Sequence, residues 1–490
     1  MRNRFAHLLP VLDYLGALFW IFGLLVLAPL IVMGARAQDW PSEVSILTFV
    51  VPAAIAFALA LALKRKAAFR PLDQRGAMLL CALGWIVISA VGALPFCIGL
   101  KVSYLDAYFE TVSGFTTTGI TMLTGLEEMP RSVIFWRALT QWLGGLGILA
   151  FFLTVVSAGG SAHVLFSAES HKIFSKRPAP GLLNTLRILW AIYALFTALV
   201  AVALVLEGLS VYDAVAHSFT CLATGGYSPY DDSIGHYRAA GYAHFVVIEY
   251  TIIAGMLLGG INFFIHYRVL TGGLRALWDN MEMRLFWIVV AGATALVAWD
   301  AQFGKASESL RYSLFQVVSI MTSTGYVTES IASPVFSALS KQIFLILMVV
   351  GGCVGSTSGG IKVLRIGVLF KMIGRELHRL THGSSAVSLV VVDKEVVDPE
   401  EIHRIAALFF AWIFLLALGG AVTAVMSDLG PMEAASGMFS ALGNIGPCYI
   451  SVKAMTELHP LVKITYIIGM LAGRLEVLPV LMLFSRRAWR

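Results

Sequence analysis

Charged residues are scarce in this sequence. Only 13% of its 490 residues are Asp, Glu, Lys or Arg, whereas 58% are hydrophobic. So little charge excludes an ordinary soluble domain, and many apolar runs are long enough to cross about 30 Å of hydrocarbon. The sequence therefore predicts an all-α polytopic membrane protein.

Cysteine is also rare, and the metal-binding residues show no informative spacing. The five cysteines include no CxxC pair, and the 11 histidines show no HExxH motif. The pattern thus indicates neither a disulfide framework nor a metal centre. There is also no nucleophile–base pair and no cofactor motif, so we do not expect an enzyme.

The distribution of Lys and Arg along the chain indicates which loops lie in the cytoplasm. Most of the 35 Lys and Arg residues fall in alternate loops and near the two ends of the chain, beginning with the run from Lys64 to Arg75. This is the positive-inside pattern. Because the basic residues lack the interleaved aromatic residues of a nucleic-acid surface, the net charge of +6 does not indicate a nucleic-acid partner. We expect a multi-pass protein surrounded by membrane lipids, with both termini in the cytoplasm.

Four short Gly/Thr-rich loops interrupt the apolar pattern. The first, residues 115–121, follows a short helical run from Tyr104 to Ser113. Non-helical backbone persists at membrane depth only where it lines a water-filled cavity or is buried in protein. Thirteen residues separate an acidic or polar residue at the predicted start of the short helix from a loop glycine, and this spacing occurs four times. The four pairs are Asp106 and Gly119, Asp213 and Gly226, Tyr312 and Gly325, and Glu433 and Gly446.

These loops have the composition of a cation filter. Their cores present carbonyl oxygens and Thr or Ser hydroxyls and contain no titratable side chain. Neutral oxygens can replace the hydration shell of an alkali cation, whereas a divalent ion calls for carboxylates. Glycine can turn its carbonyl inward at φ > 0. The alternative is that the loops are helix breakers or small-residue packing surfaces. Four copies at one spacing favour a ring around one axis.

The loops divide the chain into five parts. Two extra N-terminal transmembrane helices occupy 1–70, and four pore repeats follow at 71–180, 181–280, 281–400 and 401–490. Each repeat is predicted to contain an outer helix, a short pore helix, the loop and an inner helix. The expected long helices are 15–35, 45–63, 76–99, 133–158, 185–206, 242–270, 284–302, 340–370, 403–427 and 459–484.

A glycine-rich segment interrupts the third inner helix. Residues 351–360 include five glycines, and each glycine in a helix costs about 1 kcal/mol relative to alanine. A phosphate-binding loop is the alternative, but the segment lacks the GxxxxGK[ST] order and lies within an apolar run. We predict an intramembrane loop that crosses the pore below the filter and moves as a gate.

Several charges lie within or beside the predicted membrane segments. Arg474, in the last inner helix, is expected to be a fixed positive charge that opposes cation leak; the alternative is a structural pair with Glu476 or Glu249. Arg137 and Glu249 are expected to form buried structural pairs. Four acidic residues follow the first two filters and either concentrate cations at the mouth or are ordinary solvated loop charges: Glu127, Glu128, Asp231 and Asp232.

Motifs along essentially the whole chain resemble one known superfamily. They are the segments 110–119, 223–228, 351–362, 444–447 and 473–476. Together they resemble the Trk/Ktr/HKT superfamily of potassium transporters, and most closely the TrkH-type subunit, which has two extra N-terminal helices. Cys448 departs from the glycine that follows the proline in many relatives.

The resemblance implies potassium uptake across a bacterial inner membrane by a homodimer. It implies potassium bound by Thr117, Thr118, Thr224, Gly225, Ser323, Thr324, Asn444 and Ile445 beside the glycines Gly119, Gly226, Gly325 and Gly446. Glycine at all four filter positions goes with potassium rather than sodium. It also implies gating by Gly351, Gly352, Gly355, Ser356, Thr357, Ser358, Gly359 and Gly360, with Arg474 as a barrier.

The resemblance further implies a regulatory partner. This partner is a cytoplasmic, TrkA-like ring that binds nucleotides, and the present chain would hold potassium but no organic cofactor. A channel-like path and cation/proton symport can share one filter, so the energetics stay open. The competing hypothesis, a secondary carrier for an organic solute, would need ionisable groups at the membrane midplane, and the neutral filters disfavour it.

Overall fold

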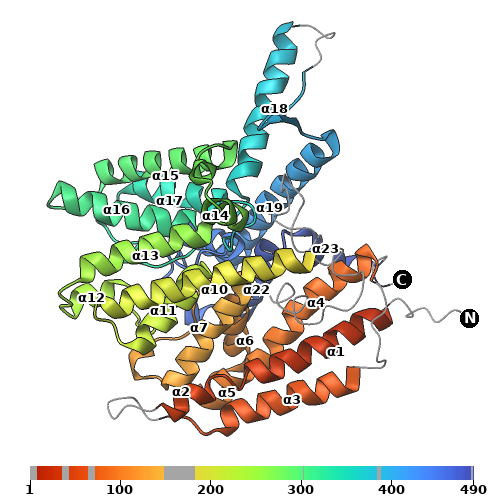
Figure 1. The fold of residues 1–490 in the computed structure, drawn as a ribbon, viewed down its shortest axis with the longest axis vertical. Helices are drawn as coiled ribbons and strands as arrows, with labels where there is room; N and C mark the ends of the chain where they lie inside the picture. Colours follow the sequence, from red (N-terminus) through yellow and green to blue (C-terminus); the bar gives the residue numbers. More distant parts are fainter. Residues whose placement is uncertain are drawn as a thin grey trace, which may run out of the picture.

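The computed structural model describes residues 8–35, 43–63, 72–147, 182–301, 303–382, 388–486 and 489. These residues form a helical bundle with one short hairpin, in which β1 (Val391–Val392) pairs antiparallel with β2 (Glu395–Val396). Leu8 at the start of α1 (Leu8–Leu25) and the end of α23 (Leu478–Phe484) lie at the same end of the bundle (Figure 1).

The N-terminal helices lie at one flank of the molecule. There α1 packs against α3 (Leu47–Leu63) and α4 (Gln74–Gly92). The chain continues after α1 as a short second helix, α2 (Leu30–Gly34), which begins after Pro29. Proline has no N–H to donate and breaks the helical hydrogen-bond ladder. The proline therefore breaks the first span near its end. The span also starts earlier than predicted, at Leu8 rather than at residue 15.

The four repeats share the predicted order of elements. The outer helices are α4 with its continuation α5 (Leu94–Leu100), α10 (Leu182–Leu206), α15 (Met281–Asp300) and α19 (Pro399–Met426). The pore helices are α6 (Tyr104–Phe115), α11 (Val211–Leu222), α16 (Ala306–Met321) and α20 (Pro431–Gly443). The inner helices begin with α7 (Arg131–Gly145), α13 (Phe245–Gly260), α17 (Ala338–Val350) and α22 (Pro460–Arg474). The shorter connecting helices are η1 (Leu126–Glu128), α12 (Gly235–Ala239), η2 (Leu274–Leu277) and α21 (Val452–Glu457).

The bundle contains several membrane-spanning candidates. Among the described residues, five helices are long and apolar enough to cross a bilayer, and α13 with α14 (Phe263–Leu270) makes a sixth if the bent pair is one span. The helices α3 and α17 are apolar but shorter. Residues 148–158 of the predicted first inner helix, and the basic residues Lys172, Lys176 and Arg177, lie outside the described residues.

Two inner helices predicted to be continuous are broken. The segment 242–270 bends by 106° between α13 and α14, where the Asn262 side chain accepts a hydrogen bond from the Phe264 amide (2.8 Å) and caps α14. The segment 459–484 breaks after Arg474, where Glu476 and Val477 have φ of 58° and 67°. Pro479 follows in the first turn of α23 and cannot continue the preceding ladder.

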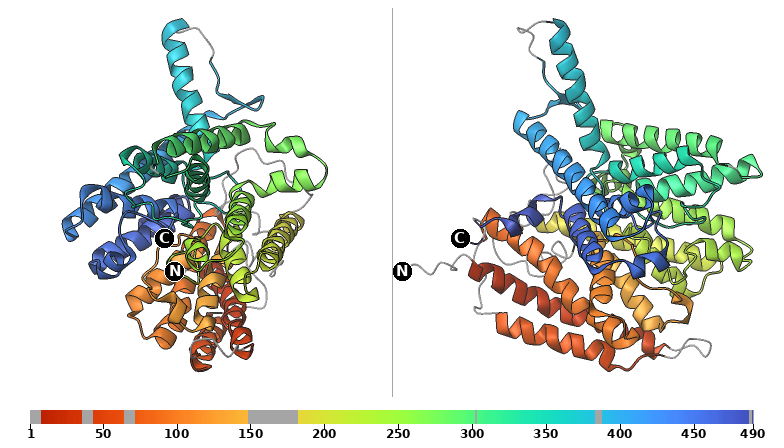
Figure 2. Two further views of the ribbon diagram at one scale, coloured as in Figure 1. Left: turned by 90° about the vertical axis from the view of Figure 1, so that its left-hand side faces the viewer. Right: turned by 180° about the vertical axis from the view of Figure 1, so that it is seen from behind.

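The third inner helix is interrupted, as predicted. The chain leaves α17 at Gly351 and becomes helical again at α18 (Val363–His382). The helix α18 projects away from the bundle, and the hairpin returns beside it (Figures 1 and 2). It bears exposed apolar side chains, including Phe370 and Leu380, together with exposed basic ones.

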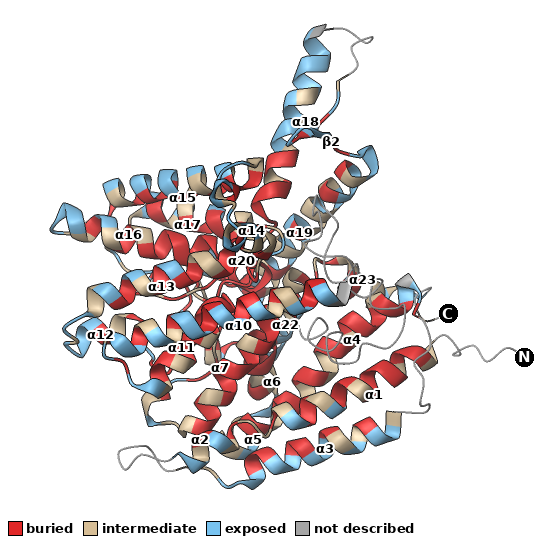
Figure 3. Cartoon of the chain, in the orientation of Figure 1, coloured by how far each residue is buried: buried red, intermediate tan, exposed pale blue. Residues whose placement is uncertain are grey.

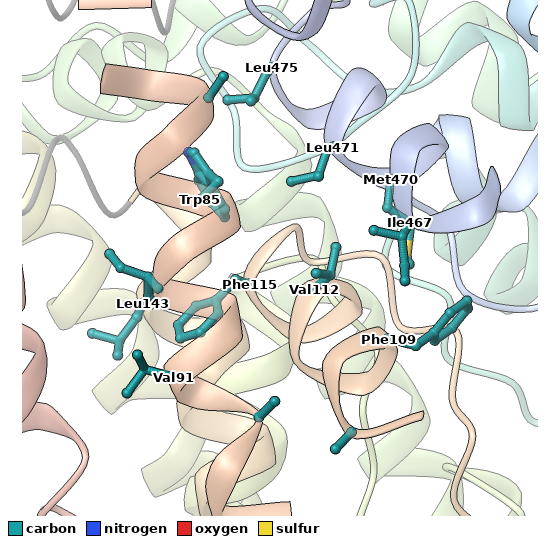
Figure 4. Packing of buried hydrophobic residues seen from close by; sticks show 14 of the residues in the cluster. Trp85, Val91, Phe109, Val112, Phe115, Leu143, Ile467, Met470, Leu471 and Leu475 are labelled. Atoms are coloured by element: carbon teal, nitrogen blue, oxygen red, sulfur yellow. The ribbon is translucent and has the colours of Figure 1, made fainter. Parts of the chain in front are cut away.

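The core surrounds the pore helices. Buried residues gather at the centre of the molecule, whereas exposed positions lie along the outer faces of peripheral helices (Figure 3). Many of these exposed residues are apolar, such as Leu199 on α10 and Ile288 on α15. Apolar outer faces are expected of a protein in contact with lipid. Figure 4 shows α6 packed between α4 and α22, with Phe109 on the α22 side and Phe115 near Leu143.

Candidate functional site

The four pore helices end in the same way. Each runs into a residue with positive φ two positions before the filter glycine: Thr117 (54°), Thr224 (51°), Ser323 (54°) and Asn444 (54°). The next amide then bonds back to a carbonyl five residues earlier, at 2.8 Å in the first three repeats and 3.0 Å in the fourth. The donor and acceptor residues are Thr118 and Ser113, Gly225 and Thr220, Thr324 and Ser319, and Ile445 and Ser440. This is the 6→1 bond of a Schellman helix end, repeated four times.

The residue that donates this bond differs among the repeats, but the backbone geometry does not. It is threonine in the first and third repeats, glycine in the second and isoleucine in the fourth. Positive φ is uncommon for residues other than glycine, and for a β-branched residue such as Thr117 or Thr224 it is a genuine outlier. Such strain persists only where the surrounding structure imposes it, typically at functional sites.

The four loops close into a ring in chain order. Each filter glycine has positive φ, and a Cβ placed on it would overlap a backbone carbonyl of the next loop. The glycine and carbonyl pairs are Gly119 with Gly225, Gly226 with Thr324, Gly325 with Ile445, and Gly446 with Thr118. The carbonyl always belongs to the residue before the neighbouring glycine. Only glycine leaves room for this approach.

The ring is negative in potential but carries no formal charge. The C-terminal ends of four pore helices meet there, and each end carries a partial negative charge. Hydroxyl groups add further neutral oxygens: Thr116 contacts Thr118 at 2.7 Å, and Thr322 contacts Thr324 at 2.8 Å. Among the described residues there is no group of three or more His, Cys, Asp or Glu side chains suited to a metal ion. This chemistry suits a monovalent cation stripped of water.

A cavity of about 640 Å³ opens on one side of the ring and is lined by all four filter glycines. Asp231 and Asp232 also line it. Asp231 is tied into the loops, since it accepts a hydrogen bond from the Gly125 amide (2.6 Å) and its own amide donates to Glu127 (2.9 Å). Burial lowers the pKa of the nearby His236 imidazole. The cavity thus gives access to all four filter glycines from one side of the ring.

The glycine-rich segment lies against the other side of the ring. The Thr357 hydroxyl bonds to the carbonyls of Leu222 and Gly259 at 3.0 Å, and the Thr224 hydroxyl contacts it at 3.1 Å. The Gly359 amide donates to the Ser323 hydroxyl (2.5 Å). A Cβ on Gly359 would overlap the fourth pore helix end at Gly443. The segment thus contacts the second, third and fourth filter loops directly.

The same segment is anchored to neighbouring helices. The Val354 amide donates to buried Glu282 on α15 (2.6 Å), and the Phe263 amide at the α13–α14 break donates to the Gly355 carbonyl (3.1 Å). Lys362, at its end, donates through Nζ to the Ser358 carbonyl. The loop is therefore held by hydrogen bonds to several neighbouring elements rather than by a continuous helix.

Arg474 bridges three parts of the site. Its guanidinium donates to the Thr357 carbonyl (2.6 Å), to the Thr117 hydroxyl (3.2 Å) and to the carbonyls of Gly144 and Gly145 at the end of α7. It thus lies between the first filter loop and the glycine-rich segment. Of the acidic residues considered as structural partners, Glu476 forms an ion pair with Arg365 (2.7 Å) and Glu249 with Arg311 (3.3 Å).

Comparison with known proteins identifies the family. The family model described as TrkH, cation transport protein, matches residues 46–489. The chain belongs to the TrkH family. Relatives include the Trk system potassium uptake protein TrkH of Escherichia coli strain K12, 34% identical over 86% of this chain and 87% of that protein. The protein of the same name from Halomonas elongata is 31% identical over 98% of this chain and 99% of its own length.

A solved TrkH structure has the same fold. The crystal structure of the potassium transporter TrkH from Vibrio parahaemolyticus aligns over 100% of both chains with a TM-score of 0.84 and 27% sequence identity. The predicted all-α membrane architecture, with its four repeats and two extra N-terminal helices, is thereby confirmed. The relatives are transport proteins rather than enzymes.

Some residues of this TrkH family site were not predicted as functional. Gln141 on α7 donates to the Gly225 carbonyl (2.6 Å) and accepts from the Tyr227 amide (3.0 Å). Arg137 forms the expected buried pair, but its partner, Glu110, was not foreseen. The available signal was a polar residue within an apolar helix, which usually faces a cavity or a partner.

Proposed function

We propose that this protein takes up potassium across the inner membrane of a bacterium through the ring of four loops. The main support for the proposal is the ring itself, in which four backbone carbonyls and four glycines alternate in chain order. The names of the relatives, which are potassium uptake proteins, support the choice of ion. Potassium is the transported ion, and no organic cofactor is required on this chain.

The filter works by replacing water with fixed oxygens. The proposed lining comprises Thr117, Thr118, Gly119, Thr224, Gly225, Gly226, Ser323, Thr324, Gly325, Asn444, Ile445 and Gly446. Carbonyl and hydroxyl oxygens held at a set spacing compensate a potassium ion for its lost hydration shell. The close approach of each glycine to the neighbouring carbonyl keeps that spacing, so larger side chains at these four positions would change selectivity.

The gate is the glycine-rich segment together with Arg474. The segment contacts three filter loops, and Arg474 places a positive charge beside the remaining one, next to Thr117. A cation leaving the filter meets both the loop and this charge. Opening requires the hydrogen bonds of Thr357 and Gly359 to the filter loops, and that of Arg474 to the Thr357 carbonyl, to be exchanged for water.

We further propose that the protein works as a homodimer with a cytoplasmic, TrkA-like ring that binds nucleotides. The helix α18 supports this view, because it starts directly after the gate at Val363 and projects from the bundle with exposed apolar and basic side chains (Figure 2). A partner bound to α18 would act on the gate through one continuous helix.

Transport in liposomes tests the function. Purified protein should take up radioactive rubidium, and excess potassium should suppress uptake whereas excess sodium should not. Arg474→Ala removes the barrier charge and should raise the flux, with Arg474→Lys, which keeps the charge, as its matched control. Uptake that sodium suppresses as well as potassium does would contradict the proposal, as would the absence of uptake by both the wild type and Arg474→Ala.

A further inference from the structure

The pore helices share a second register position. Nine residues before each filter glycine lie Glu110, His217, Gln316 and Gly437. The first three are at most 1% exposed and reach the segment that follows their own filter glycine. Glu110 accepts from the Met122 amide (2.8 Å), His217 Nε2 contacts the Ser228 hydroxyl (3.2 Å), and Gln316 donates to the Glu329 carbonyl (2.7 Å).

Only the first of these positions forms an ion pair among the described residues. Arg137 Nε lies 2.6 Å from Glu110 Oε1, and both side chains are at most 3% exposed. Glu110 also accepts hydrogen bonds from the Thr121 hydroxyl, at 3.0 Å to each carboxylate oxygen. The carboxylate therefore joins the inner helix α7 to the segment after the first filter.

The arginine continues this connection to the second repeat. Its Nη1 donates to the Ser228 carbonyl (3.0 Å), and its guanidinium lies 3.4 Å from the centre of the Tyr227 ring. The Tyr227 hydroxyl returns to the first repeat, donating to the carbonyls of Glu110 (2.9 Å) and Ile120 (3.3 Å). Both segments that leave the first two filter glycines are thus held by one closed set of contacts behind the ring.

A buried ion pair is weak evidence for stability, because desolvation of its two charges can exceed their attraction. What such a pair supplies is short, directional geometry, especially where a guanidinium fork reaches two acceptors at once. The corresponding positions of the other repeats form no ion pair among the described residues. At the fourth, Gly437 has no side chain, and the space beside it is taken by the Tyr466 hydroxyl.

We propose that Glu110, Arg137 and Tyr227 form a strut that sets the separation of the first and second filter loops and so tunes cation selectivity. These are positioning residues, which act through the loops that they hold. The inference rests on the proposed function, since it assigns the strut to the same ring.

The main test is Glu110→Gln. The amide keeps the volume of the carboxylate but turns an N–H group toward a partner that is itself a donor, either Arg137 or the Met122 amide. The segment after the first filter must then shift. The ratio of the potassium and sodium concentrations that suppress rubidium uptake equally should change by about tenfold, equivalent to about 1.4 kcal/mol. Rubidium uptake itself should persist.

A matched control exists in the same chain. Glu249 on inner helix α13 pairs with Arg311 on pore helix α16 at 3.3 Å and is similarly buried. This pair also joins an inner helix to a pore helix, but among the described residues neither of its side chains bonds to a segment that leaves a filter glycine. Glu249→Gln removes the same charge from a similar pair. It should change thermal stability without changing the potassium-to-sodium ratio, which separates a positioning role from a structural one.

Two further variants keep the inference testable if Glu110→Gln does not fold. Arg137→Lys keeps the charge but loses the fork, and Tyr227→Phe removes one hydroxyl. Each should shift selectivity in the same direction as Glu110→Gln and by less. Folded variants that discriminate between the ions as the wild type does would overturn the strut while leaving the potassium filter intact. A wild type with no potassium preference would instead overturn the proposed function itself.

Discussion

Thr117, Thr224, Ser323 and Asn444 share a backbone conformation that L-residues seldom adopt. Each ends a pore helix, and the carbonyl of the residue after it approaches the glycine of an adjacent loop. A strained conformation of this kind costs on the order of 1–3 kcal/mol, and the protein bears it four times. At the residue scale, the proposed filter is defined by these positions and by the glycines that leave space for the carbonyls of the adjacent loops.

Gly119→Ser tests that relationship at one position. The serine Cβ would overlap the Gly225 carbonyl, so this oxygen must move away from its place in the ring. We expect the preference for potassium over sodium to fall by about tenfold, or about 1.4 kcal/mol, in the rubidium competition assay. Gly241→Ser is the matched control, because Gly241 also has positive φ but a Cβ there would meet open space. Equal effects of the two substitutions would mean that backbone strain, and not the ring contact, is responsible.

At the element scale, three inner helices break beside the proposed gate. The breaks lie at Ile261–Asn262, at residues 351–362 and at residues 475–477. They meet at the glycine-rich segment, because the Cys353 amide donates to the Gly260 carbonyl (3.0 Å) and Arg474 donates to the Thr357 carbonyl (2.6 Å). The proposed gate is therefore a junction of three broken helices rather than a single loop.

Thr357→Val tests this junction. Valine keeps the shape of threonine but removes the hydroxyl that bonds to the Leu222 and Gly259 carbonyls and contacts Thr224. Because each net hydrogen bond contributes about 0.5–1.5 kcal/mol, the closed loop should loosen and rubidium flux should rise several-fold. Thr465→Val removes a comparable hydroxyl on the exposed face of α22 and should leave the flux unchanged. A flux unaffected by Thr357→Val would show that these bonds do not hold the gate closed.

The sequence predicted the features that depend on local spacing. The short helix and the glycine thirteen residues after its marker residue are local, and so is the glycine-rich segment. The start of the third pore helix was predicted wrongly, because α16 begins at Ala306 rather than at Tyr312. The breaks after Gly260 and Arg474 were missed because they depend on the Asn262 cap and on Pro479 within otherwise apolar segments. Contacts such as Glu110–Arg137 and Arg365–Glu476 were missed because they join residues far apart in the sequence.

At the scale of the whole molecule, the four repeats contribute different side chains to the site. The ring is closed by equivalent backbone contacts, but the groups behind it differ: an ion pair in the first repeat, histidine in the second, glutamine in the third and glycine in the fourth. The proposed gate likewise lies mainly in the third repeat, and Arg474, the proposed barrier charge, lies in the fourth.

The location of a bound cation tests the central claim most directly. Crystals of the protein grown in rubidium should show anomalous scattering on the axis of the ring, within coordination distance of the carbonyls of Thr118, Gly225, Thr324 and Ile445. Potassium added in excess should remove the signal, and sodium should not. Rubidium found only at the acidic residues of the mouth, such as Asp231 and Asp232, with none inside the ring would contradict the account.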